Sequence, residues 1–147
     1  MSERRDQLTR REAEAWAEFE ELTASIDRER REEPGLENGW SVKDLLWHVA
    51  YWWGDLATQL AEIRGGTYEE IQYTSDQTNA TNAEVLALSR SMTLADVEAE
   101  VVRARERMLA AWAALSEIGH DAAENFSSET IEHYEEHLPD LRAFAAR

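Results

Sequence analysis

The chain has 147 residues, of which 43% are hydrophobic, two are proline and six are glycine, and this composition favours one all-α domain over residues 1–147. Acidic residues outnumber basic ones by 31 to 15, and the net charge near −16 excludes nucleic acid and anionic membrane surfaces as expected partners. Cysteine is absent, so disulfides, zinc–thiolate sites and a protein thiol nucleophile are excluded as well.

The first half of the chain predicts two amphipathic helices that end at turn-forming residues. The first covers roughly residues 5–30 and stops before Pro34-Gly35. The second begins at Ser41, where Asp44 completes a capping-box pattern, and ends at Gly65-Gly66. Its apolar residues recur at steps of three and four, in the series Val42, Leu45, Val49, Trp52, Leu56, Leu60 and Ile63. Such a seam predicts packing against other helices.

The second half predicts a long loop, a short helix and two long helices. Polar residues from Thr67 to Thr78 indicate the loop, and a short helix follows near residues 79–89. Thr93 is expected to cap a helix whose apolar residues continue to Ile118, and the last helix is expected to begin near Ser127 or Ser128. Four long helices and one short helix predict an antiparallel four-helix bundle with one long connection.

No segment reads as a membrane anchor or a leader peptide. The N-terminal residues are highly charged, and no run of about 18 uncharged apolar residues occurs. We therefore expect a cytoplasmic protein.

Three histidines form the candidate functional site. His133 and His137 are four residues apart, which places both rings on one face of a helix, about 6 Å from each other. His48 occupies the corresponding flank of the second predicted helix, so it meets the pair if these helices are neighbours. Three neutral imidazoles with open coordination positions suit a catalytic zinc, nickel, iron, cobalt or copper ion. His120, after Gly119, is interpreted as a surface residue in a polar loop.

An ordinary structural interpretation competes with the metal site. Two of four histidines fall four residues apart by chance in about one chain in ten of this length, so the spacing alone is weak evidence. His48 by itself would be a partly buried core histidine with one satisfied hydrogen bond. Pro139, two residues after His137, is expected to remove a helical hydrogen bond, either as a simple kink or as strain near a functional site.

Two motifs resemble those of the DinB-like superfamily of metal-binding bundles, which includes thiol-dependent transferases and the N-terminal domain of mycothiol-dependent maleylpyruvate isomerase. The segment Trp40-Ser41-Val42-Lys43-Asp44-Leu45-Leu46-Trp47-His48-Val49-Ala50 is similar to the helix that supplies the first histidine. The segment His133-Tyr134-Glu135-Glu136-His137-Leu138-Pro139 is similar to the closing histidine pair. The resemblance implies an up-down-down-up bundle, a homodimer, and a zinc or nickel ion bound by His48, His133 and His137.

The site and the resemblance together favour a metal-dependent transferase that joins a low-molecular-weight thiol to a small electrophile. A metal-dependent hydrolase and a non-catalytic module that binds metal or small molecules are the alternatives. Asp44 and Glu136 are candidate acceptors of the histidines' remaining ring protons. Four aromatic residues are candidates for the pocket wall, although aromatic residues at helical spacing are more often core residues: Tyr51, Trp52, Trp53 and Tyr134.

Overall fold

The computed structural model describes residues 3–147, and every regular element among them is helical, as the composition predicted. The α-helices are α1 (Glu3–Ser25), α2 (Val42–Gly65), α3 (Ser75–Arg90), α4 (Leu94–Ala113), α5 (His120–Ser127) and α6 (His133–Ala145). Two short 3₁₀ helices, Arg28–Arg30 and Glu37–Gly39, lie between α1 and α2. None of the helices in this part of the chain is long and apolar enough to cross a membrane.

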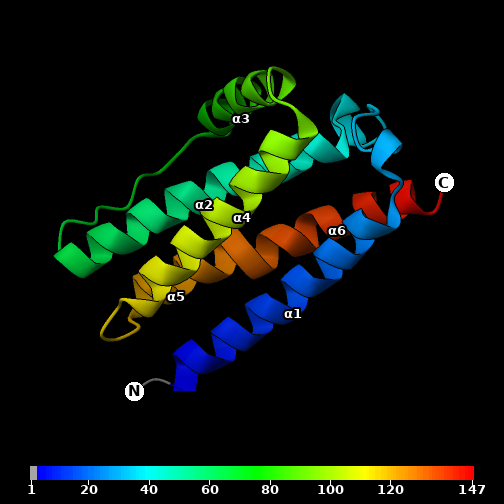
Figure 1. Cartoon of the computed structure of the whole chain (residues 1–147). Coiled ribbons are helices and arrows are strands. Elements are labelled where there is room, and N and C mark those ends of the chain that lie inside the picture. Colours follow the sequence, from blue (N-terminus) through cyan, green and yellow to red (C-terminus); the bar gives the residue numbers. More distant parts are fainter. Residues whose placement is uncertain (1–2) are drawn as a thin grey trace.

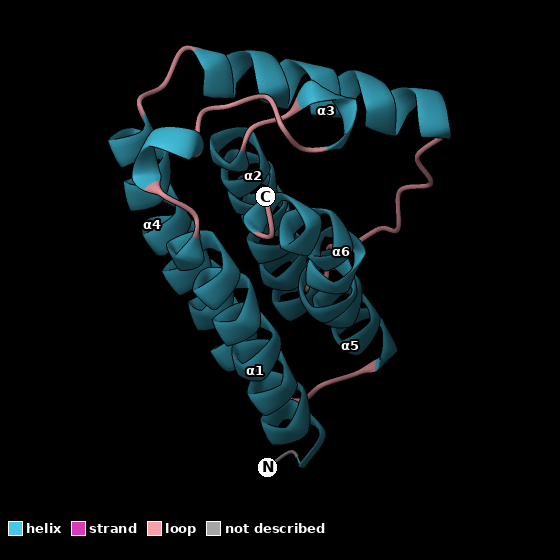
Figure 2. Cartoon of the chain, turned by 90° about the vertical axis from the view of Figure 1, so that its right-hand side faces the viewer, coloured by secondary structure: helices cyan, strands magenta, loops and turns pink. Residues whose placement is uncertain are grey.

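The long helices lie side by side in two directions. In Figure 1, α1 and the α5–α6 segment run one way along the molecule, whereas α2 and α4 run the other way. Contacts are most extensive between α2 and α4, and α1 packs on α6 while α3 packs on α2. Figure 2 shows α3 lying across the end of the other helices, where it connects the loop after α2 to the start of α4. This crossing helix forms one wall of the site described below.

Local capping signals place the helix that carries His48. Ser41 and Asp44 form the predicted capping box, in which the Ser41 hydroxyl accepts from the Asp44 backbone N–H and the Asp44 carboxylate accepts from the Ser41 backbone N–H. Gly66, in the left-handed conformation with φ of 76°, ends α2. The Thr93 hydroxyl caps α4 by accepting a single hydrogen bond from the backbone N–H of Asp96.

The buried seam of α2 differs from the predicted seam at one aromatic position. Trp53 is fully buried, whereas its neighbour Trp52 is only partly buried. Both positions fit a repeat of three or four residues after Val49, so periodicity alone does not separate them. The burial of Trp53 turns Trp52 towards α3.

Four of the predicted helix boundaries were wrong. Helix α1 ends at Ser25 instead of residue 30, and Arg28–Arg30 forms a separate 3₁₀ helix. Helix α3 begins at Ser75 instead of residue 79, because Thr74 and Gln77 form a capping box within the expected loop. Helix α4 ends at Ala113, before Ile118. The last helical segment begins at His120 instead of Ser127 or Ser128, since α5 passes into α6 through a π-helical turn, Ser128–Glu132.

Helix α6 continues through Pro139 to Ala145, so the proline does not end it. Proline lacks the N–H that would bond to the carbonyl of Glu135, and both residues are exposed. Water can therefore satisfy the freed carbonyl.

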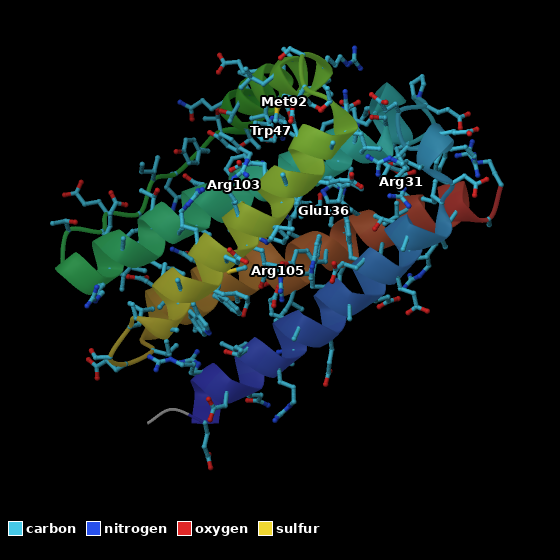
Figure 3. The ribbon with its side chains drawn as sticks, viewed as in Figure 1. Arg31, Trp47, Met92, Arg103, Arg105 and Glu136 are labelled. Carbon is cyan, nitrogen blue, oxygen red and sulfur yellow. The ribbon has the colours of Figure 1, made fainter. Side chains whose placement is uncertain are left out.

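A buried polar network connects α1, α2, α4 and α6 at the centre of the molecule. Glu12 of α1 is fully buried, and its carboxylate forms an ion pair with Arg105 of α4 at 2.6 Å. The Tyr134 hydroxyl donates to Glu12 at 2.8 Å and accepts from the Trp53 indole N–H at 2.8 Å. The side chain of Arg105 is labelled in Figure 3. Since Tyr134 adjoins His133, this network contacts the helix that carries the histidine pair.

Candidate metal centre

His48 is held at the interface between α2 and the α5–α6 segment. It lies in the second turn of α2 and is only 6% exposed. The indole of Trp40 packs edge-on against the imidazole with ring centroids 4.9 Å apart, and the ring centroid of Trp52 lies 6.5 Å from that of His48. These two aromatic rings restrict the orientation of the imidazole.

His133 and His137 are placed by the start of α6. The π-helical turn Ser128–Glu132 comes directly before His133, and α-helical geometry then stacks the two imidazoles with ring centroids 4.8 Å apart. A π turn contains one more residue than an α-helical turn, so the side chains that follow it are rotated about the helix axis. The turn thus sets the angle at which both histidines face α2.

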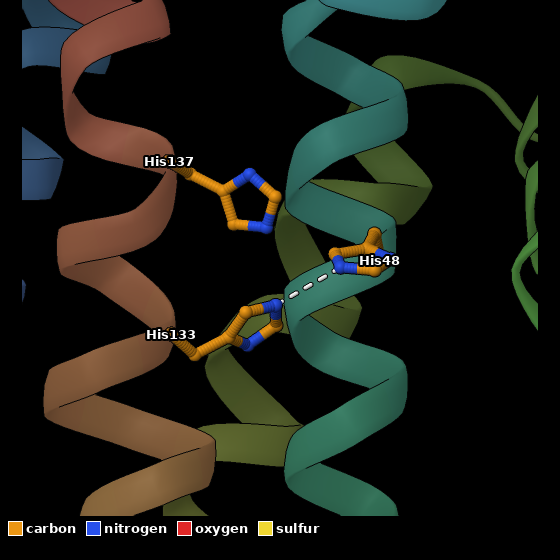
Figure 4. Close-up of side chains that lie close together, drawn as sticks. All are labelled: His48, His133 and His137. Atoms are coloured by element: carbon orange, nitrogen blue, oxygen red, sulfur yellow. Dashed lines mark hydrogen bonds between the residues drawn. The ribbon is translucent and has the colours of Figure 1, made fainter. Parts of the chain in front are cut away.

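The three rings meet between α2 and α6, as Figure 4 shows. The centroid of His48 lies 4.9 Å from that of His133 and 5.2 Å from that of His137. The Nε2 atoms of His48 and His133 are 2.9 Å apart, and one ring nitrogen from each histidine lies within 4.8 Å of the others. The sequence predicted this convergence, and the structure brings all three residues together.

The geometry and the electrostatics fit a divalent metal ion. Tetrahedral ligand nitrogens at about 2.1 Å from an ion are separated by roughly 3.4 Å, so a small adjustment of these rings would suffice. His137 Nε2 is buried and has no hydrogen-bond partner among the described residues, although it points towards the other two rings. A bound cation would satisfy this nitrogen.

Burial also keeps the three imidazoles neutral, which is the form that binds a metal. Desolvation, with a contribution from His137, lowers the pKa of His48 to about 3. Desolvation lowers the pKa of His133 well below its usual value, with His48 and His137 adding to the effect. The pKa of His137 is lowered by desolvation, and the nearby carboxylates of Glu136, Asp140 and Glu37 oppose the shift. Protons therefore compete weakly with a metal at this site.

A pocket of about 610 Å³ opens beside the histidines. Its walls come from α2, α3, the α5–α6 segment and the loops before α2 and α3. The lining residues are Asn38, Trp40, His48, Trp52, Tyr73, Thr78, Asn79, Asn82, Ala83, Leu86, Ser128, Glu129, His133, Glu136 and His137. The cluster is therefore open on one side to a small molecule.

One of three comparisons with known proteins found a related family. The profile of the family described as "Mycothiol maleylpyruvate isomerase N-terminal domain" matches residues 13–124. The chain belongs to this family. The matched region includes His48 and ends before His133 and His137. Neither the search of curated proteins nor the search of solved structures found a match.

The aromatic lining of this family member differs from the sequence-based expectation. Of the four aromatic residues predicted to line the pocket, only Trp52 does so. Trp53 and Tyr134 are fully buried in the core. Tyr51 lies on the outer face of α2, where it borders a separate pocket. Successive helical residues point about 100° apart, so three adjacent aromatics cannot share one wall. The pocket instead receives Trp40 and Tyr73 from loops.

The two residues predicted to accept the histidine ring protons, Asp44 and Glu136, lie in different surroundings. Both carboxylate oxygens of Asp44 are occupied, one by the Ser41 backbone N–H and the other by the hydroxyl of Ser89. Asp44 therefore caps α2 and anchors α3, so the structure gives it a structural role. Glu136 lines the pocket, but no hydrogen bond joins its carboxylate to a histidine among the described residues, and the Nδ1 atoms of His48 and His133 have no partner there, so its predicted role is not confirmed. His120 is exposed, as predicted, but it is the first residue of α5 instead of a loop residue.

Glu129 is a pocket residue that sequence reasoning missed. It lies four residues before His133, so the series 129, 133 and 137 marks one helical face in the sequence. Desolvation, together with the charges of Asp55 and Glu136, raises its pKa to about 7. A partly buried carboxyl group that titrates near neutral pH can act as a general acid or base.

Replacing Glu129 with glutamine is expected to stabilise the metal-free protein above pH 7 by roughly 1–3 kcal/mol. The folded state holds a proton on Glu129 up to a pKa of about 7, whereas the unfolded chain loses it near 4.5. Wild-type stability is therefore lost as the pH rises through this window, and Glu129→Gln avoids that loss. Urea unfolding in a chelator at pH 4.5, 6 and 8 measures the effect. A gain of equal size at all three pH values would contradict the assignment.

Proposed function

We propose that this protein is a metal-dependent transferase that joins a low-molecular-weight thiol to a small electrophile. His48, His133 and His137 would hold one divalent ion, with zinc or nickel as the expected metals. The convergence of one buried and two partly buried imidazoles, all held neutral, beside an open pocket carries the proposal. The description of the family, which names mycothiol, supports a thiol as the nucleophile.

The chain supplies binding and orientation for such a reaction. A bound divalent metal would lower the pKa of a thiol, or of water in a hydrolase, so that the nucleophile forms near neutral pH. The protein contains no cysteine, so the reacting sulfur must come from a substrate. Trp40 and Trp52 both lie edge-on to the His48 ring, and the pocket beside them is large enough for a small thiol and its acceptor.

A metal-dependent hydrolase is the second candidate, and the position of Glu129 favours it. A carboxyl group with a pKa of about 7 in the pocket could accept the proton of an attacking water molecule. The same three histidines would serve in this reaction.

Metal content and a spectroscopic titration with thiols test the proposal together. The untagged protein is purified without chelators, analysed by elemental mass spectrometry, then loaded with Co²⁺. We expect about one metal per chain, and a change in the Co²⁺ absorption when a thiol is added. His48→Ala and His133→Ala/His137→Ala should lose the metal, whereas the exposed His120→Ala should keep it.

The alternative results separate the proposals. If no metal can be loaded, the transferase and hydrolase proposals both fail. If the metal binds but no thiol alters its absorption, the transferase is excluded, and hydrolysis or metal binding without catalysis remains.

We also propose a specific topology for the helices. The directions of α1, α2, α4 and α5–α6 support an up-down-down-up four-helix bundle of the DinB-like type. The homodimer and the cytoplasmic location stay predictions.

A further inference from the structure

We propose that the pocket beside the histidines selects against anionic ligands, and that the carboxylates of Glu129 and Glu136 cause this selectivity. The electrophile and the thiol that bind there are then neutral or cationic. The inference rests on the proposed function for the identity of the site. It goes further by assigning a charge class to the substrates.

The charged residues of the pocket all have the same sign. Glu129 and Glu136 are its two carboxylates, and no lysine or arginine is among the lining residues of the described chain. Asp55 and Glu136 lie close enough to Glu129 for their charges to act on it, and Asp140 and Glu37 act similarly on His137. A ligand that enters the pocket therefore meets two carboxylates in the lining and no basic side chain among the lining residues that the structure describes.

A metal ion would add positive charge, which Glu136, and Glu129 where it is ionised, would offset in part. A thiolate bound to that ion would offset more of it. The described lining residues include no cation for a second anionic group, and recognition of carboxylates in proteins normally uses arginine.

The remaining polar groups suit uncharged ligands. The side-chain carbonyl of Asn82 accepts from the Trp52 indole N–H at 3.1 Å, which orients the Asn82 amide and leaves its NH₂ group to donate. Asn38, Asn79 and Thr78 add neutral donors and acceptors. Such groups bind hydroxyl and amide groups, while the faces of Trp40 and Trp52 can contact the apolar parts of a ligand.

The charge of the pocket does not suit maleylpyruvate, the substrate named in the description of the family. Maleylpyruvate carries two carboxylates, and none of the described residues that line the pocket is a lysine or arginine that could pair with either of them. We therefore infer that this member of the family acts on other electrophiles, which lack a negative charge.

A matched series of small thiols tests the inference on the Co²⁺-loaded protein. Cysteamine, 2-mercaptoethanol and 3-mercaptopropionate present a cationic, a neutral and an anionic group, and the Co²⁺ absorption reports the affinity of each. Because these thiols differ in intrinsic acidity, affinity ratios are compared between protein variants. We expect E129Q/E136Q to raise the affinity for 3-mercaptopropionate relative to 2-mercaptoethanol by at least about tenfold.

The control removes the same charge at another place. E20Q/E21Q changes two exposed glutamates of α1, which do not line the pocket, and it should leave the ratio unchanged. An equal change in both double variants would assign the effect to net charge and overturn the inference. Tighter binding of 3-mercaptopropionate than of cysteamine to the wild type would overturn it as well.

A metal-free measurement keeps this test separate from the test of the proposed function. Trp40 and Trp52 are partly exposed in the pocket, so their fluorescence can be quenched by iodide, caesium or neutral acrylamide. We expect E129Q/E136Q, but not E20Q/E21Q, to increase quenching by iodide and decrease quenching by caesium. Unchanged quenching would overturn the inference even if the metal and a thiol bind, whereas the expected change would support it even if they do not.

Discussion

Saturating Zn²⁺ or Ni²⁺ is expected to raise the melting temperature of the chelator-treated protein by about 8–16 °C. A ligand present at 1,000 times its Kd, bound only by the folded state, adds about 4 kcal/mol of stability. For a chain of this size, each kcal/mol corresponds to roughly 2–4 °C. The effect should be large because the three imidazoles are already neutral and already face one another, so little reorganisation opposes binding.

The single-residue variants give this prediction its specificity. His48→Ala, His133→Ala and His137→Ala should each abolish most of the thermal shift, because each removes one of the converging nitrogens. His120→Ala is the matched control, since His120 is exposed and lies outside the cluster. Calorimetric scans with and without metal measure the shift. Retention of the full shift in any of the three site variants would show that the metal binds elsewhere.

The parts of the fold that follow from local interactions were predicted from the sequence. The capping box of Ser41 and Asp44 requires only residues three apart, and the structure forms it as expected. The spacing of His133 and His137 similarly determined their stacking on one helix face. His48 joined them only because α2 packs against the α5–α6 segment, which the sequence suggested through the family resemblance and not through periodicity.

The features that depend on how one helical segment is rotated relative to the next could not be predicted. The π turn at Ser128–Glu132 makes α5 and α6 continuous, but no local signal in these residues distinguishes it from a helix start at Ser128. Which of Trp52 and Trp53 is buried depends on the hydrogen-bond partner of each indole N–H. Trp53 donates to Tyr134, and Trp52 donates to Asn82.

The burial of the Glu12 carboxylate could not be predicted from the sequence. Glu12 lies in a helix crowded with glutamate and arginine, and nothing local sets it apart from its exposed neighbours. Its partners Arg105 and Tyr134 are 93 and 122 residues away. Only the assembled fold therefore identifies it as a core residue.

Arg105→Ala is expected to lower the free energy of unfolding by about 3–5 kcal/mol, because it leaves the buried carboxylate of Glu12 without its cation. Arg142→Ala is the matched control. Arg142 also pairs with a glutamate of α1, Glu18, but both side chains are about half exposed, so a loss of at most about 1 kcal/mol is expected. Urea unfolding at pH 7 compares the two variants. Equal losses would mean that burial of Glu12 adds nothing to the strength of its pair.

A second substitution distinguishes the lost charge pair from lost packing. Glu12→Gln in the Arg105→Ala background removes the unpaired charge but keeps a carbonyl oxygen that can accept from the Tyr134 hydroxyl. It should therefore recover part of the lost stability, whereas a loss caused by missing packing around Arg105 would not be recovered. Since Tyr134 is next to His133, we expect metal affinity to fall in Arg105→Ala and to recover with the same second substitution. Recovery of stability without recovery of affinity would show that the network supports the fold without orienting the histidines.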